Sequence, residues 1–284
     1  MPAAPLRRFL HKVLRTVQAG PTKWVVPQMV LFVSQFKPES CVVAEVRESP
    51  NHGERRAGMK PDMLVLHYTG MPDAEAALRH LCWPSSEVSA HYVVLEDGRV
   101  IQCVPEARRA WHAGQSSWAG ETDINSCSIG IEIANPGHDH GYPDFPRRQI
   151  AAVTALCRGI FIRHRIPADR VLAHSDIAPS RKRDPGEKFP WKMLHDSGIG
   201  LWVKPAPVVK DGPIYVLGER HNAIRELQEM LARYGYGVEV TGYLDVATQE
   251  VISAFQRHFR PARIDGAADV STIETLRALL RTRG

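Results

Sequence analysis

Two short apolar runs in this chain each end in a histidine, and the second leads directly into a loop. Residues 64–67 form the first run and residues 171–174 the second. The segment 174–186 that follows is rich in proline, glycine and serine and contains Asp184. Because these residue types favour turns, we expect the loop to fold Asp184 back beside His174.

Two imidazoles and one carboxylate form a ligand set typical of catalytic zinc, which leaves the fourth position open for water. The chain has 13 histidines, so a hydrogen-bonded structural role for these residues is the alternative. The strand-like run before His174 favours the metal site, as does Pro185, which disfavours helix at Asp184. The pattern points to a hydrolase.

Residues 1–40 differ in pattern from the rest. Apolar residues between Leu6 and Val17 recur at helical spacing beside basic ones, which predicts a basic amphipathic helix. The apolar stretch 24–36 is interrupted by Pro27 and is shorter than the about 20 residues that span a bilayer, so we expect no membrane span. Three interpretations stay open: a helix that contacts a membrane surface, a degenerate targeting segment, or an extension translated from a mis-assigned start.

Residues 41–203 alternate between strand-like and helix-like patterns. We expect helices at 74–82 and 146–164, and a short one after Pro190. A hairpin is expected where residues 91–95 and 100–104 flank an Asp-Gly turn. With further strands at 63–67, 127–134 and 170–173, the predicted fold class is α/β, with a mixed central sheet flanked by helices.

The last part of the chain has a different pattern. Residues 204–213 contain three prolines, which indicates a linker. Residues 214–284 show three apolar helical patterns separated by glycine-containing turns, which predicts a small three-helix domain.

Composition excludes few function classes. A net charge of +5 over 284 residues, without a basic stripe interleaved with aromatics, argues against nucleic acid as a partner. The five cysteines are odd in number and include no Cys-x-x-Cys pair, so neither a disulfide framework nor a thiolate metal site is indicated. Cys103, Cys127 and Cys157 lie in apolar runs and are predicted to be buried.

Five motifs follow one another in a fixed order. They are residues 66–69 (Leu-His-Tyr-Thr), 89–92 (Ser-Ala-His-Tyr), 111–114 (Trp-His-Ala-Gly), 128–132 (Ser-Ile-Gly-Ile-Glu) and 174–186. Together they resemble the zinc-dependent N-acetylmuramoyl-L-alanine amidases of the AmiD/AmpD-like branch, whose fold peptidoglycan recognition proteins share. The resemblance covers roughly residues 63–203, and residues 214–284 resemble a peptidoglycan-binding domain. The alternative for residues 214–284 is a helical packing module without a binding role.

The resemblance implies a function and a cofactor. It implies zinc on His67, His174 and Asp184, with peptidoglycan or muropeptides as substrate. The reaction it implies is hydrolysis of the amide between the lactyl group of N-acetylmuramic acid and L-alanine of the stem peptide.

The resemblance also implies two catalytic roles. Glu132 would take a proton from water and pass it to the departing amine. A charged residue between isoleucines is otherwise more often on a solvent face. Lys182 would stabilise the developing oxyanion, although a lysine between two arginines otherwise suggests a solvated basic loop.

Candidate substrate contacts rest on the resemblance alone. They are Tyr92, His112, Trp118 and Asn135. His91 fits a core histidine equally well. Histidines without such context are expected at the surface, namely His80, His138, His140, His164 and His195.

Alternatives of function and location remain. A recognition protein that binds muropeptides without catalysis would have lost metal ligands, whereas all are present here. A zinc amidase acting on another amide is the second alternative. A wall-binding domain implies the cell envelope, whereas unpaired cysteines fit a cytoplasmic enzyme. Deletion of residues 214–284 is expected to abolish wall binding and to spare activity on soluble muropeptides.

Overall fold

The computed structural model describes residues 11–16, 25–30, 36–209 and 211–283. The chain divides into two compact units, Met1–Lys37 and Pro38–Gly284. In the first unit, β1 (His11–Thr16) pairs antiparallel with β2 (Val25–Val30). The predicted amphipathic helix is therefore wrong for residues 11–16, and the rest of its span lies outside the described residues. Valine and threonine recur in the two paired segments, and these β-branched residues favour strands.

The second unit is built around a mixed six-stranded sheet in the order β10-β5-β9-β6-β7-β3. Four strands run parallel: β10 (Val171–Ala173), β5 (Met63–Tyr68), β9 (Ser128–Ile133) and β6 (Tyr92–Val94). The predicted hairpin joins β6 to the antiparallel β7 (Val100–Gln102), and β3 (Val43–Val46) pairs parallel with β7. The short β4 (His52–Gly53) and β8 (Arg109–Ala110) form a separate pair. The α/β prediction with a mixed sheet is confirmed.

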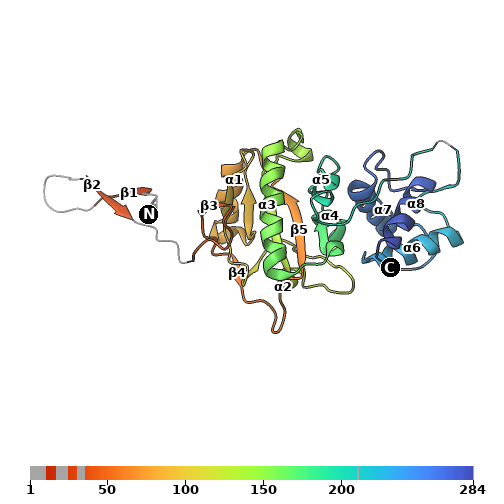
Figure 1. The fold of residues 1–284 in the computed structure, drawn as a ribbon, viewed down its shortest axis with the longest axis horizontal. Coiled ribbons are helices and arrows are strands. Elements are labelled where there is room, and N and C mark those ends of the chain that lie inside the picture. The colour runs from red at the N-terminus through yellow and green to blue at the C-terminus, as the bar shows by residue number, and fades with distance from the viewer. Residues whose placement is uncertain (1–10, 17–24, 31–35, 210, 284) are drawn as a thin grey trace. The chain divides into compact units, whose positions relative to one another are not determined.

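Helices flank this sheet (Figure 1). The long α3 (Arg147–His164) runs across one face and buries the apolar positions predicted for it, from Ile150 to Ile160. The shorter ones are α1 (Ala74–Leu81), α2 (Ile124–Cys127), α4 (His174–Ile177) and α5 (Trp191–His195). Cys103, Cys127 and Cys157 are buried, as predicted.

The side chains of β5 alternate between two cores, as the period of a strand requires. Leu64 and Leu66 pack in the core beneath α3. Met63 and Val65 belong to the core on the opposite face. His67 continues the second set, so the alternation directs it away from α3.

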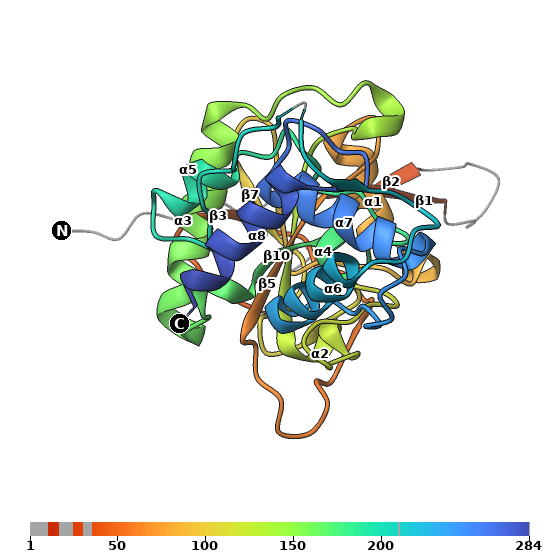
Figure 2. The same cartoon turned by 90° about the vertical axis from the view of Figure 1, so that its right-hand side faces the viewer.

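The C-terminal helical module (residues 214–283) contains α6 (Asn222–Tyr234), α7 (Val246–Phe259) and α8 (Val270–Arg281). Figure 2 shows these helices packed together. The aspartates before α7 and α8 cap those helices by accepting from backbone N–H groups of their first turns. β11 (Ile214–Tyr215) pairs with β12 (Ala268–Asp269) beside them. The three predicted helices are present.

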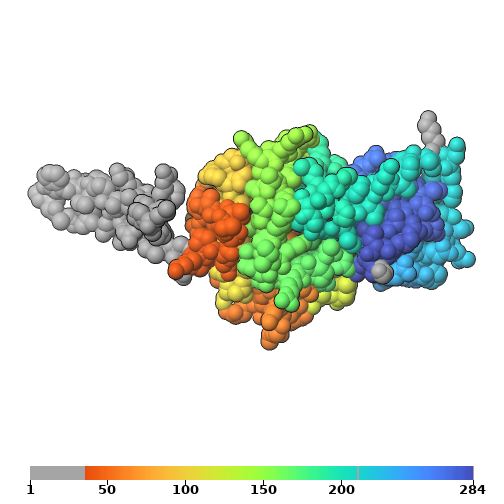
Figure 3. Space-filling view, in the orientation of Figure 1, coloured from red at the N-terminus to blue at the C-terminus, as the bar shows by residue number. Residues whose placement is uncertain are grey.

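The module shares a hydrophobic core with the sheet. Met63, Val65 and Leu172 lie in the same buried cluster as Leu227 and Phe255 of the module. The surfaces of the two regions abut in the space-filling view (Figure 3). Even the proline-rich segment is held, since Ala206 N–H donates to Thr275 and Ser271 donates to the carbonyl of Ala206. Among the helices of the described residues, none is long and apolar enough to cross a membrane.

Candidate active site

The three predicted metal ligands converge at the carboxyl edge of the sheet. Ala173 of β10 lies opposite Leu66 of the parallel strand β5. His174 follows Ala173 and His67 follows Leu66, so both histidines emerge at the same edge of the sheet. His67 Nδ1 and His174 Nδ1 are 2.9 Å apart, and Asp184 Oδ2 lies 3.2 and 3.0 Å from them. Strand β10 ends at Ala173, as predicted, and His174 begins α4.

The loop after α4 brings Asp184 into this group. Ser175 N–H donates to the carbonyl of Asp184 at 3.0 Å, and Lys182 N–H donates to the carbonyl of Ala178. These backbone bonds fold the loop onto the helix that carries His174. The predicted approach of Asp184 to His174 is therefore present.

Hydrogen bonds assign the tautomer of His174. Its Nε2 lies 3.1 Å from the carbonyl oxygen of Ala113, which can only accept, so Nε2 carries the proton. The lone pair of His174 is then on Nδ1, the atom directed toward Asp184 and His67. A buried backbone carbonyl therefore orients one candidate ligand.

A longer chain of bonds assigns the tautomer of His67. The Ser128 hydroxyl donates to the carbonyl of Ile124 at 2.6 Å, so it accepts from His112 Nε2–H at 3.1 Å. His112 Nδ1 is then an acceptor and receives the proton of His67 Nε2, also at 3.1 Å. The lone pair of His67 is left on Nδ1, at the point of convergence.

The charge states of this group suit a cation. Burial, and then the neighbouring His174, lower the pKa of His67 to about 4, and burial holds the pKa of His112 far below its usual range. Burial alone would raise the pKa of Asp184, but the two histidines keep it well below its ordinary value. The Nδ1 atoms of the two imidazoles and one carboxylate oxygen thus point at one another within 3.2 Å. Without a cation these lone pairs would repel, so the donor set fits a metal ion.

Glu132 lies on the side of the sheet that carries the candidate metal ligands, not on a solvent face. It is paired with His67 in the register of β9 and β5. Ile131 and Ile133 on either side point into the core beneath α3. Glu132 Oε2 is buried and has no hydrogen-bond partner. Burial, and then the charge of Asp184, raise the pKa of the carboxyl well above its usual value, whereas Lys182 lowers it.

Gly130 explains the spacing of the 128–132 motif. A Cβ at this position would lie 2.3 Å from the ring of His112, which is too close for any other residue. Ser128, Gly130 and Glu132 therefore share one face of β9. Ser128 bonds the His112 ring, and Gly130 leaves room for that ring. Glu132 lies next to the candidate metal ligand His67.

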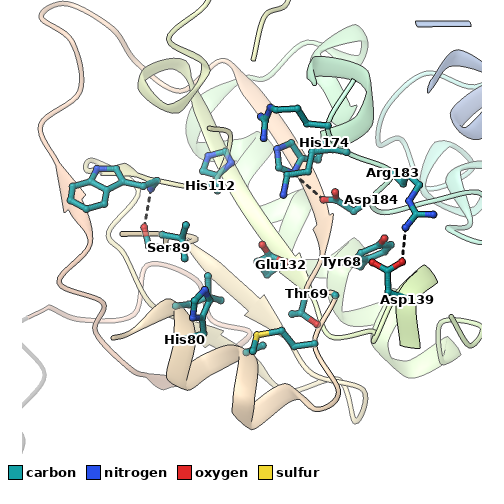
Figure 4. A pocket seen from close by; sticks show the side chains of 18 residues that line it. Tyr68, Thr69, His80, Ser89, His112, Glu132, Asp139, His174, Arg183 and Asp184 are labelled. Carbon is teal, nitrogen blue, oxygen red and sulfur yellow. Dashed lines mark hydrogen bonds and ion pairs between the residues drawn. The ribbon is translucent and has the colours of Figure 1, made fainter. Parts of the chain in front are cut away.

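His112, Glu132, His174 and Asp184 line a cavity of about 370 Å³ (Figure 4). Glu132 lies at its centre, between His174 with Asp184 on one side and Thr69 on the other. Lys182 also lines it, and no salt bridge joins its ammonium group to an acid in the part of the chain that the structure describes. An adjoining hollow of about 420 Å³ shares Trp111, His112 and Lys182 with the cavity, so the two form a continuous groove.

The four predicted substrate contacts differ in their surroundings, since only His112 lines the groove. His112 lines the groove, although both its ring nitrogens are engaged by Ser128 and His67. Tyr92 is fully buried beneath α3, and its hydroxyl donates to Glu106 at 2.7 Å. It lines neither hollow. The register explains this, because Tyr92 pairs with Ile131, which faces α3.

Trp118 and Asn135 are also buried and line neither hollow. Trp118 packs edge-on against Tyr236 of the module, with ring centroids 4.9 Å apart. The Asn135 amide donates to the carbonyl of Pro143 and accepts from Gly137 N–H, which shapes the turn after β9. The contacts of both residues are therefore with other parts of the protein.

The other histidines are placed as follows. His91 is a buried core histidine, one of the two alternatives for it, and its Nδ1 accepts from Gly130 N–H. His80 is exposed, as predicted, and lines the cavity. His138 stacks on Tyr142 and contacts Tyr68 and Glu187, so it is not a free surface group. His164 likewise contacts the buried Glu106.

Two other groove residues, Trp111 and Arg181, were not predicted although each is next to a predicted site residue in sequence. Trp111 precedes His112 in its motif, and Arg181 precedes Lys182. Asn125 is buried and accepts from the backbone N–H groups of His112 and Ala113, which holds the segment that contacts both candidate histidine ligands. No sequence pattern pointed to Asn125.

Two histidines and a carboxylate that could hold a metal ion, next to a glutamate with an unpaired oxygen, are the features of a hydrolase site. Residues 57–187 match the N-acetylmuramoyl-L-alanine amidase family, and residues 220–276 match a peptidoglycan binding domain. The N-acetylmuramoyl-L-alanine amidase AmiD of Escherichia coli (strain K12) is 40% identical over 240 residues, which are 78% of this chain and 83% of the relative. The 1,6-anhydro-N-acetylmuramyl-L-alanine amidase AmpD of Enterobacter cloacae is 35% identical over 52% of this chain and 86% of its own length.

Solved structures agree. The complex of AmiD from E. coli with anhydro-N-acetylmuramic acid-L-Ala-D-gamma-Glu-L-Lys has a TM-score of 0.67 and 36% identity, over 81% of this chain and 93% of that chain. AmpDh3 from Pseudomonas aeruginosa with anhydromuramic pentapeptide has a TM-score of 0.65 and 34% identity, over 84% and 96%. The chain belongs to the N-acetylmuramoyl-L-alanine amidases, hydrolases that act on an amide bond of peptidoglycan and muropeptides.

Proposed function

We propose that the metal is zinc and that His67, His174 and Asp184 hold it. The observation that carries this proposal is the convergence of two imidazole nitrogens and one carboxylate oxygen within 3.2 Å of one another. When bound, zinc supplies the Lewis acidity that makes water a nucleophile near neutral pH. Two imidazoles and one carboxylate are a donor set that zinc prefers.

We propose catalytic roles for Glu132 and Lys182 in cleavage of the amide between the lactyl group of N-acetylmuramic acid and L-alanine. The unpaired Oε2 of Glu132 is free to accept a proton from the attacking water and to deliver it to the departing amine nitrogen. The raised pKa of Glu132 suits this return of the proton. Lys182, on the same cavity wall, would stabilise negative charge on the carbonyl oxygen.

The bond and the metal can be tested in one experiment. The enzyme is incubated with purified muropeptides as isolated, after chelation, and after zinc is restored, and the products are measured by mass spectrometry. We expect release of an intact stem peptide beginning at L-alanine, lost on chelation and recovered with zinc. A folded, zinc-loaded sample that releases no peptide would favour muropeptide binding without catalysis, or another amide as substrate.

Lys182→Ala is expected to lower kcat by about 10²–10³-fold, the usual effect of removing one oxyanion donor. Zinc content should stay unchanged, because Lys182 is not among the converging donors. Steady-state kinetics with metal analysis would check this, with Lys192→Ala as the matched control because Lys192 pairs with the exposed Asp196 and lines neither hollow. Activity within a few-fold of the unaltered enzyme would contradict the oxyanion role.

We propose that the C-terminal helical module binds the wall, on the strength of the match over residues 220–276. The Glu132→Gln variant, which should not digest its target, is expected to co-sediment with sacculi. Excess soluble muropeptide would occupy the catalytic groove during the measurement, so that the remaining sedimentation reports the module. Complete release by the muropeptide would assign wall binding to the groove alone.

We propose the cell envelope as the location, since a wall-binding module implies a polymeric substrate there. The alternative is a cytoplasmic enzyme that acts on soluble muropeptides. Fractionation that recovers the native protein only from the cytosol would contradict the envelope location.

A further inference from the structure

A buried carboxylate connects the C-terminal helical module to α4, the helix that begins with His174. Asp176 is 1% exposed. Its Oδ1 accepts from the hydroxyl of Tyr236 at 2.6 Å, and its Oδ2 accepts from His258 Nδ1 at 2.7 Å. Oδ2 also accepts from the backbone N–H of Ala173 at 2.8 Å. Two of its three donors therefore come from the module.

The third bond places Asp176 at the base of the candidate metal site. Ala173 is the last residue of β10, and His174 follows it directly. The carboxylate thus fixes the junction between strand and helix from which the His174 side chain projects. Asp176 and His174 lie two residues apart in the single turn of α4.

A carboxylate buried this deeply requires its hydrogen bonds, because removal of one partner leaves charge without compensation. Burial, and then the charge of Asp176, raise the pKa of Tyr236 well above its usual value, so this phenol remains a donor. The His258 ring is held between Trp191 and Phe259, with centroids 3.7 and 3.8 Å away. Both donors of the module are therefore fixed in orientation.

We propose that Asp176, Tyr236 and His258 form a positioning link through which the C-terminal helical module holds His174 in its metal-binding place. This inference rests on the proposed metal site and assigns the module a second task besides wall binding. Neither Tyr236 nor His258 lines the catalytic groove, so both act through Asp176.

The test uses the full chain and removes single donors. Tyr236→Phe deletes only the hydroxyl, and His258→Leu deletes the ring donor, whereas His258→Asn keeps an N–H near the Nδ1 position. Zinc affinity would be measured by competition with a chromophoric chelator. Hydrogen exchange of residues 173–178 would be measured in the metal-free protein.

Gln228→Leu is the matched control. Gln228 is buried in the same module and bonds Tyr243 and Thr248, without contact to α4. We expect Tyr236→Phe and His258→Leu to weaken zinc binding about tenfold, the lower end of the effect of altering groups that orient ligands. Exchange at 173–178 should also accelerate, His258→Asn should recover part of both effects, and Gln228→Leu should leave both unchanged.

Two outcomes would overturn the link. Equal losses in Gln228→Leu and in the link variants would mean that general module stability is responsible. Unchanged affinity and exchange in the link variants would mean that His174 is held without the module. If the unaltered chain binds no zinc, the proposed function fails, and the exchange measured without metal still decides whether the link exists.

Discussion

Replacement of Glu132 by glutamine is expected to lower kcat by about 10²–10⁴-fold, the range for loss of a general acid-base group. Glutamine has nearly the same shape but cannot accept the proton of the attacking water. Because Oε2 has no partner in the structure, the substitution breaks no hydrogen bond. Folding and zinc content should therefore be unchanged, and removal of a buried ionisable group can even stabilise the protein.

Steady-state kinetics, zinc analysis and thermal unfolding of Glu132→Gln would check this expectation together. The pH dependence of the unaltered enzyme gives a second check. Burial and the charge of Asp184 raise the pKa of Glu132, and the base must be ionised. Activity should therefore fall as pH decreases through a value above the ordinary glutamate pKa of about 4.3. A kcat within a few-fold of normal would assign the base to another group.

The sequence was sufficient for the parts of the site that depend on local pattern. The apolar runs before His67 and His174 predicted two strands, and parallel neighbours end at one edge of a sheet. The turn residues after His174 predicted the return of Asp184. Each inference needed only strand period and turn chemistry, which are local properties.

The sequence was insufficient wherever the register or the packing partner decides. Tyr92 and Glu132 lie on neighbouring strands, yet only Glu132 faces the metal ligands, because Tyr92 is in register with Ile131. A register cannot be obtained from either strand alone. The burial of Trp118 could not be predicted, because the aromatic rings that it packs against, Tyr234 and Tyr236, are more than 100 positions away in sequence.

The role of the C-terminal helices was the least predictable feature. The three prolines of residues 204–213 are typical of a linker between separable domains, and the helices after it each have an apolar face. Whether such faces pack only on one another or also on a neighbour depends on surfaces that no periodicity reveals. Here Gly235 meets Trp118 so closely that a Cβ would lie 2.5 Å from the indole, and Arg283 pairs with Asp169.

Deletion of residues 204–284 is accordingly expected to destabilise the catalytic region, not to leave it intact as the sequence alone suggests. It would uncover Met63, Val65, Leu172 and Trp118, which are at most 2% exposed. Full burial of one such side chain is worth about 1.5–3 kcal/mol. Uncovering even part of this set consumes much of the about 5–15 kcal/mol that stabilises a typical domain. The deletion also removes Tyr236 and His258 from the buried Asp176.

We therefore expect the fragment ending at residue 203 to be insoluble, or to melt at least 10 °C below the full chain, with weakened zinc binding. Thermal unfolding and chelator competition would measure both. Deletion of residues 1–37 is the matched control, because they form a compact unit of their own and their loss should leave the melting temperature unchanged. A soluble fragment that cleaves muropeptides at the full rate would show that the module is a separable wall-binding domain and that His174 needs no support from it.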